Sequence, residues 1–109
     1  MGKQKITLCE QKGTNVSIYV EASLHDGGLT ISGQDIGQAA EDFWGDRDYE
    51  YWLTLSPAAT KEFFKLICAN KKKNPLNVLK KKFHGTEAFS DIRSFCASHG
   101  IEARFDSYS

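Results

Sequence analysis

The fold is decided by residues 16 to 32, which read VSIYVEASLHDGGLTIS. Aliphatic or alanine side chains occupy every second position from Val16 to Ala22. Successive side chains of a β-strand point to opposite faces, so this alternation predicts a strand with one buried face. The HDGG cluster at 25–28 favours a tight hairpin turn, because glycine readily adopts positive φ. Leu29 to Ser32 is then predicted as the partner strand.

The same period of two occurs on both sides of this hairpin. Ile6 to Glu10 precedes it, and the aromatic-rich segment Tyr49 to Leu55 follows it. The first three strands are predicted to form an antiparallel meander, and the fourth to run back beside the third. Near the end of the chain, Ile101 to Phe105 also alternates and predicts a fifth strand. Residues 33–48, GQDIGQAAEDFWGDRD, predict a long loop with one helical turn near Ala39 to Phe43.

Helical periodicity begins after the fourth strand. Ser56-Pro57 and Asn74-Pro75 each place a capping residue before a proline, which favours a helix start. The first helix carries an apolar stripe through Phe63, Phe64 and Ile67, and the second ends near Gly85. A third helix is predicted from a Thr86 cap to Gly100.

Strands and helices are therefore segregated in the order βββ-loop-β-ααα-β. This order predicts an α+β fold, with an antiparallel or mixed sheet of about five strands and three helices packed on one face. A chain of 109 residues suits one hydrophobic core, so we expect a single domain over residues 1–109. Sequence does not determine the strand order, and parallel pairing of the last strand stays open.

Three cysteines, Cys9, Cys68 and Cys96, are an odd number at wide spacing and form no CxxC pair. This pattern is typical of thiols in a reducing compartment. The start MGKQKITLCE lacks an apolar secretory segment, and no apolar run approaches the roughly 20 residues that span a bilayer. We therefore expect a cytoplasmic protein with no membrane partner.

Catalytic and cofactor motifs are not apparent in the sequence. His25, His84 and His99 fall in a hairpin turn and at two helix ends, where a cation interacts favourably with the helix dipole. The pair Gly33 and Gly37 lacks the third glycine or the lysine of phosphate-binding loops. No catalytic, cofactor-binding or metal-binding residue is predicted, and we expect no cofactor and no enzyme activity. A small enzyme with an unrecognised site remains an alternative.

Charge is divided unevenly along a formally neutral chain. Residues 1–60 hold nine acidic and four basic side chains, whereas residues 61–109 hold five acidic and ten basic ones. The acidic part coincides with an aromatic-rich segment, and charge with tryptophan and tyrosine is typical of protein-docking surfaces. The best interpretation is a non-catalytic interaction module that binds a basic protein. Its predicted contact residues are Asp35, Glu41, Asp42, Trp44, Asp46, Asp48, Glu50 and Trp52.

The sequence leaves two alternative binding partners open, a polyanion and a second copy of the chain. The lysine clusters Lys71-Lys72-Lys73 and Lys80-Lys81-Lys82 would suit nucleic acid or another polyanion. The neutral chain and the lack of arginine or interleaved aromatics in these clusters weigh against nucleic acid. Tyr51 and Trp52 face opposite sides of one strand, so one aromatic needs a cover other than the helices. A homodimer partner is one candidate for that cover.

The segment LTISGQDIGQAAEDFWGDRDYEYWLTLS, residues 29–56, resembles small bacterial α+β proteins of uncharacterised function. Their pattern places a GQD-x-G turn before an acidic WG-D element and a DYEYW-type strand. Some such proteins resemble immunity proteins of bacterial toxin systems, and this likeness implies a basic toxin as partner. The matching positions are Gly33, Gln34, Asp35, Gly37, Trp44, Gly45, Asp46, Asp48, Tyr49, Glu50 and Tyr51.

Overall fold

The computed structural model describes residues 4–13, 16–37, 48–67 and 74–108. It contains five strands and three helices in these ranges. The strands are β1 (Gln4–Lys12), β2 (Val16–His25), β3 (Gly28–Gly37), β4 (Asp48–Leu55) and β5 (Arg104–Tyr108); the helices are α2 (Pro57–Leu66), α3 (Pro75–Lys82) and α4 (Ala88–Ser98). The predicted α+β class and the predicted order of these elements are confirmed.

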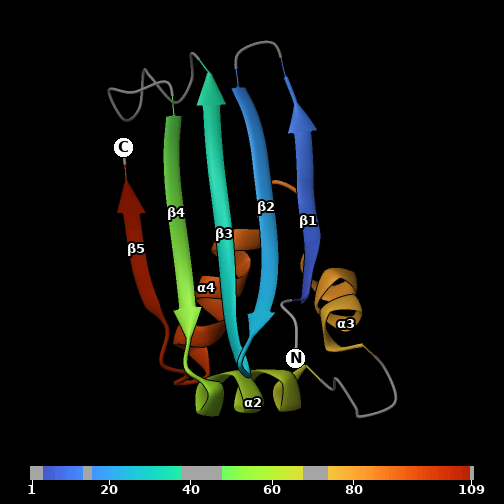
Figure 1. Cartoon of the computed structure of the whole chain (residues 1–109), viewed down its shortest axis with the longest axis vertical. Coiled ribbons are helices and arrows are strands. Elements are labelled where there is room, and N and C mark those ends of the chain that lie inside the picture. Colours follow the sequence, from blue (N-terminus) through green and yellow to red (C-terminus); the bar gives the residue numbers. More distant parts are fainter. Residues whose placement is uncertain (1–3, 14–15, 38–47, 68–73, 109) are drawn as a thin grey trace.

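The strands form one fully antiparallel sheet in the order β1-β2-β3-β4-β5 (Figure 1). β1 to β4 lie side by side in the sheet in the same order as in the sequence. β5 pairs with β4 although all three helices lie between them in the chain. The open choice between an antiparallel and a mixed sheet is thereby resolved in favour of the antiparallel one.

The three helices lie on one side of the sheet (Figure 1). α2 runs across one end of the sheet, α4 lies behind it, and α3 lies beside β1. The apolar positions of the strands face these helices and form one buried cluster with them. Its fully buried large side chains are Val20, Leu29, Ile31, Leu53, Leu55, Phe63, Ile67, Leu76, Leu79, Ile92 and Cys96.

The first two helices begin where the sequence predicts. Ser56 Oγ accepts a hydrogen bond from the backbone N–H of Ala59 at 3.1 Å, and Asn74 Oδ1 accepts one from Leu76 at 2.9 Å. The predicted Thr86 cap of the third helix is wrong. The N-cap of α4 is Glu87, whose side chain makes no capping hydrogen bond. A turn lies just before the helix, and in it the Ala88 N–H donates to the Gly85 carbonyl oxygen at 3.1 Å. Gly85 adopts a φ of 88° in that turn.

Two predicted strand boundaries are also wrong. Residues 33–37 were expected in a loop, but they continue β3 because their backbones pair with β2 from Val20 back to Val16. The fifth strand begins at Arg104 rather than Ile101, whose N–H bonds to the Cys96 carbonyl at 2.9 Å and ties it to α4. The predicted helical turn near Ala39 to Phe43 lies outside the described residues.

None of the helices in the described part of the chain is long and apolar enough to cross a membrane.

Candidate functional site

The helices cover only one face of the sheet, and the other face carries a regular array of polar and aromatic side chains. Tyr51 points to the helices and meets Phe89 edge-on, with ring centroids 4.5 Å apart. Its neighbour Trp52 therefore projects from the opposite face, since adjacent side chains of a strand alternate. We call that opposite surface the open face.

The strand register aligns the open-face side chains in two rows that cross all five strands. The first row is Glu10, Tyr19, Gln34, Glu50 and Tyr108; the second is Thr7, Glu21, Ser32, Trp52 and Asp106. Neighbouring strands lie about 4.8 Å apart, so each row is about 19 Å long. The two rows together place four carboxylates and three large aromatic side chains on one nearly continuous surface.

The charge of these two rows is almost entirely negative. Among the described residues, Glu10, Glu21 and Glu50 have no basic partner within ion-pair distance. Asp106 is paired with Arg104, whose Nε lies 3.3 Å from its Oδ2, but the pair lies at the surface, with the two side chains 46% and 80% exposed. Such a surface pair contributes little, because water screens it. The two central rows are therefore an acidic band, in which three carboxylates have no ion-pair partner among the described residues. The outer rows of the open face add Lys12 on one side of the band and Lys5 and Arg104 on the other.

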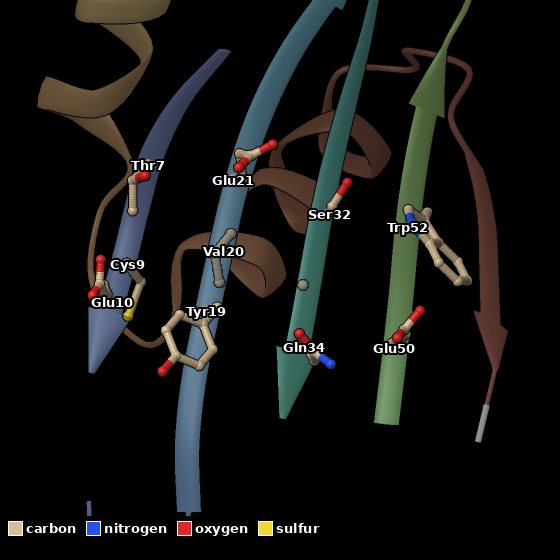
Figure 2. A pocket seen from close by; sticks show the side chains of 11 residues that line it. Thr7, Cys9, Glu10, Tyr19, Val20, Glu21, Ser32, Gln34, Glu50 and Trp52 are labelled. Carbon is tan, nitrogen blue, oxygen red and sulfur yellow. The ribbon is translucent and has the colours of Figure 1, made fainter. Parts of the chain in front are cut away.

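Figure 2 shows the shallow hollow at the centre of the open face. Glu21, Ser32 and Trp52 lie at one level of the sheet, and Tyr19, Gln34 and Glu50 lie at the next. The volume of the hollow is about 400 Å³. The half-buried Trp52 ring borders it, and Tyr108 is 72% exposed at the end of its row. Large aromatic side chains surrounded by charge are typical anchors of protein interfaces.

A register shift in β1 shapes the hollow at the edge strand. Thr7 pairs with Glu21 and Cys9 pairs with Val20, so Leu8 is the extra residue of a β-bulge. Cys9 is buried, and its Sγ lies 3.8 Å from the Ile18 carbonyl oxygen. Burial raises the pKa of the Cys9 thiol, which disfavours the reactive thiolate.

The predicted contact residues do not all lie together. Glu50 and Trp52 are on the open face, whereas Asp35 points to the helix side, where its Oδ1 accepts a hydrogen bond from the Tyr51 hydroxyl at 2.9 Å. Asp48 is the first residue of β4, and its backbone pairs with Ile36. The other four, Glu41, Asp42, Trp44 and Asp46, lie outside the described residues.

Sequence reasoning missed five of the seven charged and aromatic members of the two rows: Glu10, Tyr19, Glu21, Asp106 and Tyr108. A signal for Tyr19 and Glu21 was present, because they occupy the polar positions of the most regular strand. Asp106 and Tyr108 needed the strand order, which places β5 next to β4. The local alternation thus identifies a face, while only the register shows which residues on it are neighbours.

The half-buried pair Asp35 and Tyr51 contains the most perturbed ionisable group of the described chain, the Tyr51 hydroxyl. Burial raises the pKa of Tyr51, and the hydrogen bond to the Asp35 carboxylate raises it further. Burial also raises the pKa of Asp35, while the bond from Tyr51 lowers it in part. Burial is the larger of the two effects, so the pKa of Asp35 lies above its ordinary value.

The lysines and histidines of the helices are exposed. Lys80, Lys81 and Lys82 form the last turn of α3, where cations interact favourably with the backbone carbonyl groups. His84 and His99 each bring Nδ1 close to a carbonyl of the last turn, at 3.0 Å from Lys80 and 2.9 Å from Phe95. Lys71, Lys72 and Lys73 lie outside the described residues.

Within the described ranges, no three His, Cys, Asp or Glu side chains gather closely enough to hold a metal ion. Comparison of the chain with protein-family models, with curated proteins and with solved structures gives no match.

Proposed function

We propose that this protein is a non-catalytic interaction module whose open face binds the basic surface of a partner protein. One observation carries the proposal: Glu10, Glu21 and Glu50 stand without a described basic partner around Tyr19 and Trp52. An antiparallel sheet often leaves one face to water, so polarity alone would need no explanation. The combination of an acidic central band with half-buried Tyr19 and Trp52 and exposed Tyr108 does need one, because aromatic side chains are enriched at interface anchors.

The chemistry of the partner follows from the charge of the face. Carboxylates without counter-ions attract Lys and Arg side chains and accelerate encounter with a basic surface. The resemblance of residues 29–56 to small bacterial proteins suggests a bacterial toxin as the basic partner. We also propose that the protein is cytoplasmic, and the free thiols of Cys9 and Cys96 support this location.

A polyanion bound near α3 is the second candidate function. An open hollow between α3 and β1 is bordered by Lys80, Lys81, Lys82 and His84, and this grouping favours phosphate contacts. Glu10 borders the same hollow and opposes an anion. Filter binding of single-stranded and double-stranded nucleic acid from low to moderate salt tests this candidate. Absence of binding at the lowest salt concentration would eliminate it.

Site-specific photocrosslinking tests the proposed docking face directly. A photoreactive phenylalanine analogue in place of Tyr19 samples the open face, and the same analogue in place of exposed Lys61 on α2 samples the helix side. We expect a discrete crosslinked protein from the Tyr19 position in cells, with no equivalent from the Lys61 position. The captured partner should be basic. Equal crosslinking at both positions, or a discrete product from Lys61 alone, would contradict the proposed face.

A further inference from the structure

A second hollow lies on the helix side of the sheet, on the opposite face from the proposed docking surface. Its floor is one register row, Gln11, Ile18, Asp35 and Tyr49, contributed by the first four strands. Its walls are the first turn of α4 together with Tyr51, Phe89 and Phe105. The volume is about 550 Å³, which lies within the range of about 300–1,000 Å³ for small-molecule sites.

The side chains that line this hollow combine aromatic rings with carboxylates. Four rings, those of Tyr49, Tyr51, Phe89 and Phe105, contribute to the lining. Among the described residues of the lining, Asp35 and Glu87 are the only carboxylates, and there is no Lys, Arg or His. Aromatic faces attract cations through the ring quadrupole, and a carboxylate attracts them by charge. Both features favour a positively charged ligand.

Asp35 is held in position to receive that charge. Its Oδ1 accepts the Tyr51 hydroxyl at 2.9 Å, and within the described chain its Oδ2 has no hydrogen-bond partner. The carboxylate is half-buried, and the Tyr51 ring beside it packs edge-on against Phe89 at 4.5 Å. An ammonium group at Oδ2 would compensate for the water that the carboxylate loses on burial.

The start of α4 is the feature that would instead favour an anion. A helix N-terminus carries the equivalent of roughly half a positive charge, which is concentrated in its first turn. Two formal negative charges in the lining, those of ionised Asp35 and Glu87, outweigh that half charge. Glu87 itself is the N-cap residue of α4, and its side chain makes no capping hydrogen bond to the helix. Among the described lining residues, the balance of formal charge therefore favours a cation.

We propose that this hollow binds a small organic ammonium ion that carries an apolar group, with the ammonium at Asp35 and the apolar group against Tyr51, Phe89 and Phe105. The site does not depend on the proposed docking function, because it uses the other face of the sheet. One face of Phe105 already receives the Arg93 guanidinium, 3.9 Å from the ring centroid, so this aromatic cluster already supports cation–π contact.

The test is a titration of the whole chain with 2-phenylethylammonium, followed by backbone amide NMR. We expect saturable shifts at Ile18, Tyr51 and Phe89, and no saturable shifts with the neutral analogue 2-phenylethanol. Asp35→Asn keeps the size of the side chain and an acceptor for Tyr51, and should weaken binding about tenfold or more, because a charge-assisted bond is lost. Glu62→Gln removes an exposed carboxylate from α2, outside both proposed sites, and should leave the affinity unchanged.

Several outcomes would overturn the proposal. They are no saturable shift with 2-phenylethylammonium, equal affinity for 2-phenylethanol, or unchanged affinity in Asp35→Asn with its folded spectrum preserved. A short lysine-containing peptide that binds more than tenfold tighter than the free amine would assign the hollow to a side chain of a partner protein instead of a small molecule. None of these results depends on Tyr19 crosslinking, so failure of one proposal is distinguishable from failure of the other.

Discussion

Gly33 shows how a single residue can be required by a side chain on the neighbouring strand. It pairs with Tyr51 across β3 and β4, and the Tyr51 ring lies over it so closely that a Cβ at residue 33 would collide with the ring. An aromatic ring that covers a glycine on the neighbouring strand stabilises such a pair. The sequence contains this glycine as part of an apparent turn motif, GQDIG, and local composition alone therefore suggested a loop. The cross-strand partner that explains it is 18 residues away in the chain.

Gly33→Ala should lower the free energy of unfolding by about 1–3 kcal/mol, because the added methyl group overpacks the site and displaces the Tyr51 ring. Urea denaturation measures the change. Ser32→Ala on the open face is the matched control and should change little. In a Tyr51→Ala background the cost of Gly33→Ala should largely disappear, since the ring that it displaces is gone. A full cost in that background would refute the proposed contact.

We predict that Asp35 makes the stability of the protein dependent on pH. The pKa of its carboxyl is raised in the folded state by burial, so the folded protein binds a proton more strongly than the unfolded chain does. Stability from this residue is therefore present at low pH and is lost as the pH rises from the ordinary aspartate pKa through the raised one. Relative to Asp35→Asn, the wild type should lose stability across that interval. Urea titrations at a series of pH values measure the difference, and a pH-independent difference would contradict the assignment.

At the scale of elements, helix-capping residues and the alternation of apolar and polar side chains predict the helices and strands well. They do not predict the ends of elements that depend on contacts between residues far apart in the sequence. Ser56 and Asn74 carry their own capping oxygen, so the sequence identifies α2 and α3 directly. The start of β5 depends on Ile101, whose N–H is bound by the last turn of α4 and not by the sheet. The candidate site is predicted only in part for the same reason, since Glu50 and Trp52 become neighbours of Tyr108 and Asp106 only through the β4–β5 register.

Thr60 links helix α2 to the β3–β4 hairpin. Its buried Oγ1 accepts the Leu29 N–H at 2.9 Å and donates to the Leu55 carbonyl at 3.4 Å. Thr60→Val preserves the shape and leaves the Leu29 N–H without this acceptor, so the free energy of unfolding should fall by about 1–3 kcal/mol. Thr54→Val, at an exposed position of β4, is the control and should be nearly neutral. Equal effects of the two substitutions in chemical denaturation would show that the buried bond contributes no stability.

At the scale of the whole molecule, the uneven charge of the sequence becomes two layers. The described helices carry six basic and two acidic side chains, at Lys61, Lys65, Lys80, Lys81, Lys82 and Arg93 against Glu62 and Asp91. The two central rows of the open face carry four carboxylates and no basic residue. The sheet separates these layers, so a formally neutral protein has a basic helix layer and, on the open face, an acidic central band. Lys5, Lys12 and Arg104 lie in the outer rows of that face, on either side of the band. A basic partner is attracted to the central band.

The central claim is tested most directly by the association rate constant of the crosslinked partner, measured with purified proteins across ionic strength. The open-face variant is Glu21→Lys with Glu50→Lys, and the matched control is Glu62→Lys with Asp91→Lys, which makes the same change of charge on the helices. We expect the rate constants of the wild type and the control to fall steeply with salt, as electrostatically steered association does. The open-face variant should associate about tenfold or more slowly at low salt and lose most of that salt dependence. Equal rate constants for the open-face variant and the wild type, with both proteins folded, would contradict the claim that this face binds the partner.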